Sequence, residues 1–437
     1  ALLGAAGTTI VAVPGWIACD GLSALVLLLV AAVNVSAAIF SWGYVPARLA
    51  PADPAAERRY YINYNLFVSS LLLVPLVLEP ALVWIMIELT TLLSVFLVGF
   101  DRTRGALEAA WKYVVLTLMG AAIALLGVLL MYWALWTAGG RAFTWDGLVA
   151  AAPHMPAGVI QMAFLLVLVG FGAKIGLVPL HTWIPAAYSY APSPICALLS
   201  GAEATAVLYV VLRLVPVAVS VPAVHVSGAL LAFGLLSVAV AVFLILQTSD
   251  YKRLFAYSTI EHMGIILVAA GLGGALASYG AVAQLLTHSV TKAFCFLAVG
   301  SAVIVTNTRD TGSIRGLVRT SPVAGIALLL GGLAIAGAPP FAVFLSEFAI
   351  FRAGVSEGHA VVVALLAACV IVGFVAIMVH VNRMVFGSPT GASGRPRLPA
   401  ACVVALAAAV VPVVALGLYV PRPVFELLSE AARWIGR

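Results

Sequence analysis

The sequence predicts an all-α fold class, a polytopic membrane helix bundle of about 12–14 spans. Hydrophobic residues make up 64% of the 437 residues and charged residues only 9%, so the chain has too few polar side chains to cover a soluble globule. Apolar runs of about twenty residues, long enough to cross a bilayer as a helix, also recur along almost the whole chain. These two observations place the protein in a lipid bilayer.

About thirteen spans are placed by apolar runs that end at proline, glycine or clustered charges. The longest polar connections, near 43–61, 137–157, 305–322 and 387–398, are short, so we expect a single transmembrane domain over residues 1–437. The predicted spans, in order, are 20–42, 62–78, 81–100, 113–136, 158–180, 194–214, 226–246, 254–273, 277–304, 323–338, 341–355, 360–386 and 399–420.

Charge and motif content exclude several function classes. The net charge of +6 is carried mostly by arginines in the connections, a pattern typical of cytoplasmic loops that contact anionic headgroups, and no nucleic-acid-binding module is visible. The five cysteines form no CxxC pair, and no phosphate-binding loop of the GxGxxG or GxxxxGK type is present. We therefore expect no catalytic, cofactor-binding or metal-ligating residues in this chain.

Two segments predict interrupted helices. Proline lacks an amide donor and clashes with the preceding turn, so we expect breaks within or near the membrane at Pro179 and Pro185 and again at Pro339 and Pro340. Paired breaks of this kind are typical of transporters built from repeats, where the ion path passes the breaks.

Glu88 and Lys174 are ionisable residues inside apolar runs. An unpaired carboxylate or ammonium is costly at that depth, so we expect Lys174 to be the partner of Glu88. The alternative is a static buried salt bridge that only fixes helix register. Glu203 and Glu347 also lie in or beside apolar runs and are candidate proton sites.

His288 and Lys292 are four residues apart and should share one helix face, which predicts a relay step or, alternatively, a polar contact that only holds helices together. Asp250 and Lys252 lie at a span boundary, where membrane anchoring explains them as well as function does. The same two interpretations stay open for the neighbouring pair, Glu261 and His262.

Three stretches in order resemble signatures of the antiporter-like membrane subunits of respiratory complex I, Mrp-type antiporters and membrane-bound hydrogenases. They are GFGAKIGLVPLHTWIP (170–185), DYKRLFAYSTI (250–260) and HSVTKA (288–293), and the resemblance spans roughly residues 20–390. STIEHMG (258–264) and the stretch from Gly337 to Phe348 look most like the hydrogenase-4 component F branch, which belongs with group 4 hydrogenase and formate hydrogenlyase-type complexes.

The resemblance implies two inverted five-helix repeats, about 81–214 and 226–386, each with a broken helix, around a central hydrophilic axis. Some relatives carry lysine where Thr205 or Glu347 stands here, which is a departure from their pattern. The roles implied by matching motifs are Glu88 as the paired glutamate, Lys174 as its lysine, Lys252 (accompanied by Asp250) or Lys292 with His288 as the central relay, and Glu347 as the terminal residue.

The leading hypothesis is a proton-translocating, or proton/sodium-antiporting, subunit of a multisubunit redox complex. Its partners would be other membrane subunits and a peripheral redox arm, which would hold iron–sulfur clusters and nickel-iron or other metal centres. We expect a multi-pass protein of the cytoplasmic (inner) membrane of a prokaryote. The alternatives are an Mrp-type cation/proton antiporter subunit, an inorganic-carbon-uptake membrane subunit, and a membrane scaffold that carries a catalytic arm without transport.

Overall fold

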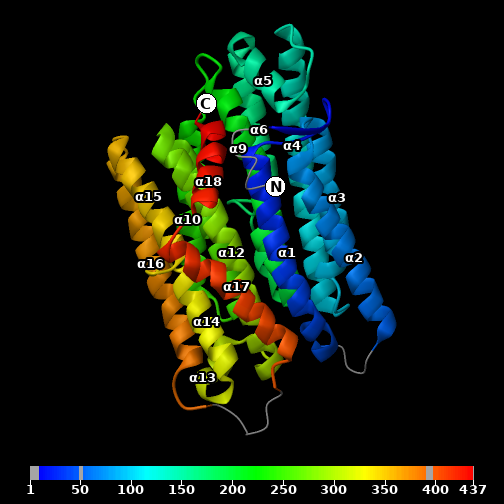
Figure 1. Ribbon diagram of the computed structural model, residues 1–437, viewed down its shortest axis with the longest axis vertical. Coiled ribbons are helices and arrows are strands. Elements are labelled where there is room, and N and C mark those ends of the chain that lie inside the picture. Colours follow the sequence, from blue (N-terminus) through cyan, green and yellow to red (C-terminus); the bar gives the residue numbers. More distant parts are fainter. Residues whose placement is uncertain (1–8, 49–52, 390–396, 437) are drawn as a thin grey trace.

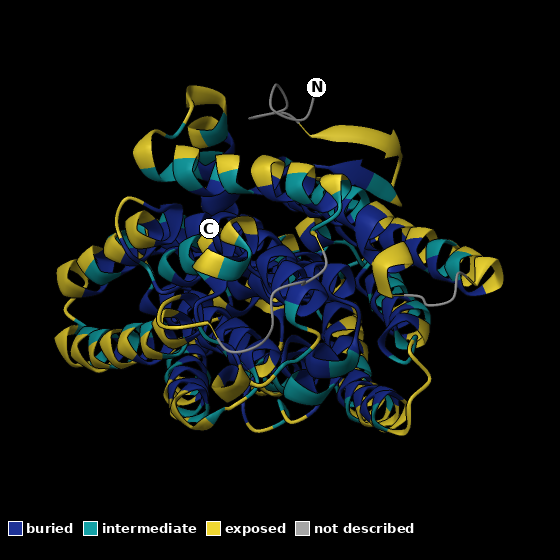
Figure 2. Cartoon of the chain, turned by 90° about the horizontal axis from the view of Figure 1, so that it is seen from below, coloured by how far each residue is buried: buried dark blue, intermediate teal, exposed yellow. Residues whose placement is uncertain are grey.

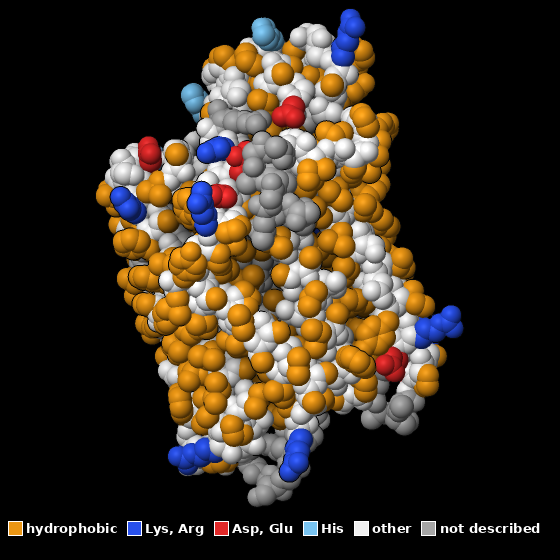
Figure 3. Space-filling model, viewed as in Figure 1, with side chains coloured by type: hydrophobic (Ala, Val, Ile, Leu, Met, Phe, Trp, Pro, Cys, Tyr) orange, Lys and Arg blue, Asp and Glu red, His pale blue; other side chains and the backbone are white. Residues whose placement is uncertain are grey.

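The computed structural model describes residues 9–48, 53–389 and 397–436, and it is almost entirely helical (Figure 1). Within these residues, 10 helices are long and apolar enough to cross a membrane, which confirms the polytopic helix bundle. Apolar side chains dominate the sides of the molecule, and the visible charged side chains lie toward its two ends (Figure 3). This distribution is the one that a bilayer-spanning protein requires.

The helices run up and down between two ends of the bundle. We call the end that carries Arg48, Arg104 and Arg309 the basic end, and the end that carries the two short strands the hairpin end. The first half of the chain forms α1 (Gly21–Arg48), α2 (Pro54–Leu73), α3 (Pro80–Val98), α4 (Arg104–Thr137), α5 (Trp145–Ala151), α6 (Ala157–Ile175), α7 (Ile184–Tyr190), α8 (Ser193–Leu198) and α9 (Ala204–Val219). The second half forms α10 (Ser227–Gln247), α11 (Tyr251–Leu272), α12 (Gly274–Thr306), α13 (Leu317–Thr320), α14 (Pro322–Ile335), α15 (Ala342–Ser356), α16 (Ala360–Val385), α17 (Ala400–Leu418) and α18 (Arg422–Ile435). Three 3-10 turns, η2 (Val74–Leu76), η3 (Ala152–His154) and η5 (Thr311–Ser313), and one π-helical turn, η4 (Leu199–Glu203), complete the helical elements.

A small antiparallel hairpin precedes α1, and the sequence interpretation missed it. Its strands are β1 (Ile10–Val13) and β2 (Ile17–Cys19), with Ile10 opposite Cys19. Pro14 and Gly15 lie in the turn between the strands, where Gly15 has φ +78°.

Two predicted spans, 323–338 and 341–355, are the two halves of one broken helix. α14 has 14 residues and α15 has 15, so each is only about 21–23 Å long against a hydrocarbon core of about 30 Å. Predicted span 62–78 lies mostly in α2, whose first turns carry charged residues, and α2 is not among the 10 spanning candidates.

The centre of the bundle is built from three helical segments, 193–219, α11 and α12. In the most apolar stretch of each, 94–100% of the residues are buried. The outer helices α10, α16 and α17 are only 28–39% buried over their apolar stretches. Seen from below, buried residues fill the middle of the bundle and most exposed residues lie toward its outside (Figure 2). The central segments also carry most of the ionisable residues singled out in the sequence. Because these segments are buried inside the protein, their charged groups must be compensated by other protein groups.

Candidate functional site

The first helix break lies between α6 and α7. α6 ends at Ile175, and Gly176 takes a left-handed conformation (φ +91°) in which its amide donates to the carbonyl of Gly172 at 2.8 Å. Pro179 lies in the non-helical segment that follows, whereas Pro185 lies in the first turn of α7, where proline is well tolerated. Pro185 therefore begins a helix rather than interrupting one.

The second break lies between α14 and α15 and contains Pro339 and Pro340. Gly337 has φ +75°, and a Cβ placed on it would collide with the carboxylate of Glu347, so that carboxylate is packed directly against the broken backbone. Each break thus lies beside a predicted ionisable residue: Lys174 in the last turn of α6, and Glu347 in α15.

Lys174 forms its ion pair with Glu203, not with Glu88 as the sequence interpretation expected. The Lys174 Nζ–Glu203 Oε1 distance is 2.8 Å, and the two side chains are only 2% and 3% exposed. Lys174 also donates to Thr91 Oγ1, and Glu203 accepts from Thr90 Oγ1 at 2.8 Å and from the Tyr113 hydroxyl at 3.3 Å. The pair is therefore hydrogen-bonded on both sides, as a buried ion pair needs to be.

Glu88 is buried near this pair but is not bonded to it. Neither of its carboxylate oxygens has a hydrogen-bond partner among the described residues, and the side chain lies one turn before Thr91 on α3. The sequence could not rank Glu88 and Glu203 as partners, because their choice depends on how α3, α6 and the 193–219 segment are rotated about their axes. Lys174 consequently has one engaged carboxylate and a second one nearby.

The π-helical turn η4 connects this pair to the centre of the protein. Its extra residue shifts the hydrogen-bond ladder, so that the amide of Ala204 donates to the carbonyl of Leu199. One side of the turn presents Glu203 to Lys174. The other presents Ser200, whose hydroxyl lies 2.8 Å from that of Thr259 and whose carbonyl lies 3.3 Å from His288 Nε2.

His288 and Lys292 are both completely buried on α12. The ammonium of Lys292 donates to the carbonyl of Phe255 at 2.7 Å and to the hydroxyl of Ser258, both on α11. No carboxylate of the described chain lies within ion-pair distance of Lys292. Lys292 is therefore a buried ammonium whose hydrogen-bond partners are neutral.

His262 joins the row from α11, with its ring centroid 5.3 Å from that of His288. Its Nδ1 lies 2.9 Å from the amide nitrogen of Gln284, and its Nε2 lies 2.9 Å from the carbonyl of Ile335, the last residue of α14. Because the Gln284 amide donates, Nδ1 accepts and Nε2 carries the proton, which fixes a neutral imidazole.

The row ends near the second break. The Gln284 carbonyl oxygen accepts from the hydroxyl of Ser346, which also lies 2.8 Å from that of Thr287. Glu347, the next residue, is 5% exposed, and its carboxylate is near the Gln284 side chain. Glu261 is buried as well, but it faces Gly373 on α16, and its Oε2 has no partner among the described residues. Glu261 is therefore beside the row rather than within it.

Asp250 and Lys252 lie at the basic end. Asp250 caps α11 by accepting from the amide of Lys252 at 2.8 Å, and its carboxylate also accepts from the hydroxyl of Ser189. Lys252 is 3% exposed, donates to the carbonyl of Ala191 and lines an open cavity of about 530 Å³. Its burial argues against simple headgroup anchoring.

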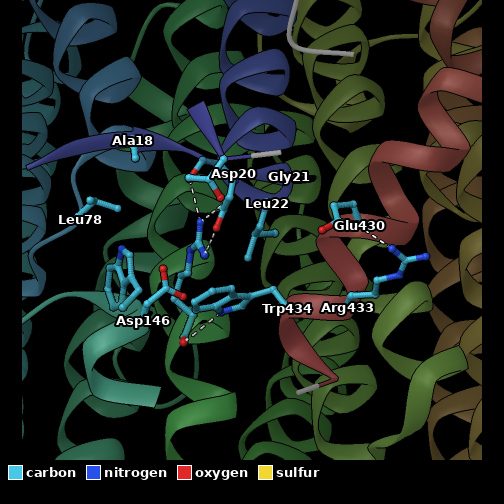
Figure 4. A pocket seen from close by; sticks show the side chains of 13 residues that line it. Ala18, Asp20, Gly21, Leu22, Leu78, Asp146, Glu430, Arg433 and Trp434 are labelled. Carbon is cyan, nitrogen blue, oxygen red and sulfur yellow. Dashed lines mark hydrogen bonds and ion pairs between the residues drawn. The ribbon is translucent and has the colours of Figure 1, made fainter. Parts of the chain in front are cut away.

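Sequence reasoning missed a second buried ion pair, near the hairpin end. The guanidinium of Arg213, on α9, donates to both carboxylate oxygens of Asp20 and to the hydroxyl of Ser23 at 2.8 Å, and it lies 4.3 Å from the ring of Trp434. Asp20 and Trp434 line a cavity of about 220 Å³ (Figure 4). Arg213 lies in an apolar run just as Lys174 does. The energetic cost of burying a charge in such a run could therefore have identified Arg213 from the sequence as well.

Asp20 precedes α1 and is ionised at neutral pH. Burial favours the neutral acid, but the charge of Arg213 and the hydrogen bonds from Arg213 and Ser23 outweigh burial and lower the pKa of the Asp20 carboxyl from its ordinary value.

The broken helices, the buried lysines and the central polar row together define an antiporter-like membrane subunit. The family model described as "NADH:quinone oxidoreductase/Mrp antiporter, TM" matches residues 79–372, and the chain belongs to this family.

One relative is the hydrogenase-4 component F homolog of Methylacidiphilum infernorum (isolate V4), which is 35% identical over 423 residues, covering 94% of this chain and 87% of the relative. Subunit N of the F(420)H(2) dehydrogenase of Methanosarcina mazei is 30% identical over 365 residues, covering 79% of this chain and 71% of that protein. Both resemblances agree with the family expected from the sequence motifs.

Solved structures give the same fold. A chain of the membrane-bound sulfane sulfur reductase, an archaeal respiratory membrane complex, superimposes with a TM-score of 0.84 at 27% identity, covering 96% of this chain and 84% of that one. A chain of the Mrp complex from Dietzia sp. DQ12-45-1b also reaches 0.84, at 21% identity and with the same coverage. The latter likeness shows the fold alone.

Proposed function

We propose that this chain translocates protons across a prokaryotic cytoplasmic membrane as one subunit of a multisubunit redox complex. One observation carries the proposal: a row of buried acids, bases and hydroxyls runs from Lys174 and Glu203 through Ser200 and the two imidazoles to Glu347. Protons move between such groups by short transfers, and the energetic cost of burying them argues that they serve a function.

Lys174 is the proposed switch of the first half of the row. It is bonded to Glu203, while the carboxylate of Glu88, one turn from Thr91, is without a partner. Moving the ammonium from Glu203 to Glu88 would leave Glu203 without its counter-charge and favour proton uptake there. The exchange makes two states of similar charge, which a partner subunit can bias.

The change in charge at Glu203 would be transmitted from the first half to the second through η4. A change in the charge of Glu203 acts on Ser200, three residues earlier on the same turn, whose carbonyl is in contact with His288. Lys292, one helical turn beyond His288, would hold or release a proton in response, and Glu347 would be the terminal site. The inverted repeats proposed for 81–214 and 226–386 agree with a discontinuous helix in each segment.

The energy must come from partners. The relatives include a hydrogenase-4 component F homolog and a subunit of F(420)H(2) dehydrogenase, and one solved neighbour belongs to a respiratory membrane complex. We infer that other membrane subunits and a peripheral arm with iron–sulfur clusters, and nickel-iron or other metal centres, accompany this chain. The basic end, with Arg48, Arg102, Arg309, Arg315 and Arg319, would face the cytoplasm.

The test is proton pumping by the intact complex in proteoliposomes, driven by its electron donor. Lys174→Ala or Lys292→Ala should lower proton pumping at least tenfold. Electron transfer should persist in both variants, at the wild-type rate or more slowly. Lys112→Ala is the matched control, because Lys112 is 52% exposed and paired only with Glu108 on the same helix, and it should pump normally.

Full pumping by either variant would overturn these roles. Electron transfer with no ion flux in the wild-type complex would instead identify a scaffold. Flux that requires sodium or potassium would identify a cation/proton antiporter of the Mrp type. Bicarbonate-dependent flux without an electron donor would favour inorganic-carbon uptake.

A further inference from the structure

We propose that the basic end binds an anionic phospholipid, with its phosphate in a cationic cavity and its acyl chains in an adjoining apolar groove. The inference concerns residues outside the polar row and does not depend on proton translocation.

The cationic cavity, about 530 Å³ in volume, lies where α1, α4, α11 and α12 reach the basic end. Four cationic side chains line it, those of Arg48, Arg104, Lys252 and Arg309, and Asp101 is the only lining residue with a carboxylate. The lining therefore carries a clear excess of positive charge.

Within the part of the chain that the structure describes, these four cations have no ion-pair partner. None of them forms an ion pair with a described residue, whereas Lys112, Lys174 and Arg213 each do. Such an excess of positive charge around one open cavity predicts an anionic ligand.

Two of the cationic groups are held in place by neutral contacts. The guanidinium of Arg309 lies 4.6 Å from the Tyr190 ring and donates to the Ser189 carbonyl and, at 3.0 Å, to its hydroxyl. Arg48 donates to the side-chain oxygen of Asn307 at 3.1 Å. Each guanidinium has five N–H donors, so both keep donors for a ligand. A preorganised group binds at a lower entropic cost than a mobile one.

A second cavity, about 720 Å³, adjoins the first and shares Arg48, Asp101 and Thr103 with it. It extends between α2, α3 and α4. Asp53, Arg59, Asn63 and Arg102 line part of it, and Val95, Phe96, Phe100 and Leu107 line the rest, with Phe96 and Leu107 63% and 55% exposed. We call the part lined by Val95, Phe96, Phe100 and Leu107 the apolar groove.

A phospholipid matches both parts together. The shared residues stand at the membrane ends of α1, α3 and α4, the depth at which lipid phosphates lie, and the groove continues along the apolar sides of α3 and α4. Juxtamembrane Lys and Arg side chains are attracted to an anionic leaflet. A free phosphate would fill only the cationic cavity and would leave the groove unexplained.

The experiment is native mass spectrometry of the purified full chain, titrated with phosphatidylglycerol or phosphatidylcholine of the same acyl length. We expect phosphatidylglycerol to bind at least tenfold more tightly. Arg104→Gln/Arg309→Gln should remove most of this preference. The control is Arg141→Gln, which removes an exposed arginine just beyond the C-terminal end of α4, at the hairpin end. Phe96→Ser/Leu107→Ser should weaken both lipids.

Equal binding of the two lipids, or the same loss in Arg141→Gln, would overturn the proposal. Displacement of the lipid by millimolar inorganic phosphate would identify a free-anion site and would also overturn it. Unfolding temperatures in phosphatidylcholine control for folding, because the double arginine variant should match the wild type there and differ only in phosphatidylglycerol.

Discussion

Replacing Glu203 with glutamine tests whether Lys174 has two alternative partners. The amide keeps the size of the side chain but removes the charge that faces the ammonium at 2.8 Å. Breaking a buried ion pair in this way typically costs about 3–5 kcal/mol, because a charge is left buried without a counter-charge. If the ammonium turns to Glu88, whose oxygens have no partner, much of that cost is recovered.

We therefore expect Glu203→Gln alone to cost about 1–2 kcal/mol of unfolding free energy and Glu88→Gln/Glu203→Gln to cost the full 3–5 kcal/mol. Glu88→Gln alone should cost little, since it breaks no hydrogen bond in the structure. The measurement is a denaturant titration of the purified chain in mixed micelles, followed by tryptophan fluorescence. Glu108→Gln, on the surface of α4, controls for charge loss and should leave the midpoint unchanged.

The outcome separates two interpretations of the site. Losses that simply add in the double variant would show that Lys174 does not exchange between the two carboxylates, and the switch would be refuted. A wild-type midpoint in both Glu203→Gln and Glu88→Gln/Glu203→Gln would show that the ion pair of Lys174 contributes nothing to stability.

Three further perturbations test other parts of the site. Gly337→Ala should cost about 1–3 kcal/mol in the same titration, because alanine is strained at φ +75° and its methyl group would displace Glu347; an unchanged midpoint would refute this packing. Arg213→Gln should destabilise the chain by about 3 kcal/mol at pH 7. Because the pKa of Asp20 is lowered in the folded state, its contribution exists above the ordinary value of 3.8 and is lost as the pH falls through the lower folded value. The unfolding midpoints of wild type and Arg213→Gln should accordingly converge in acid, and a constant gap down to pH 2 would contradict the pairing. Ser200→Ala removes the hydroxyl that lies 2.8 Å from that of Thr259 but keeps the carbonyl that contacts His288; it should change stability by only about 1 kcal/mol yet slow proton pumping severalfold, and normal pumping would exclude the Ser200 hydroxyl from the route.

The sequence by itself determined the membrane location, the helical class, both breaks and the family. These features depend on local properties: apolar length sets a span, and proline or glycine interrupts it wherever it is packed. The buried positions of Lys174 and Lys292 followed from the same reasoning, because a charge inside a long apolar run has few places to go.

Only the tertiary structure decided which groups meet. The choice of Glu203 over Glu88 depends on helix rotation and on the π-helical turn, and the Arg213–Asp20 pair joins residues 193 positions apart. That 323–338 and 341–355 are two short halves of one broken helix rather than two full spans likewise came from the structure, in which α14 and α15 have only 14 and 15 residues. Hydropathy reports how favourably each segment enters lipid but not which of its faces meets which neighbour, and that choice is made by packing between helices.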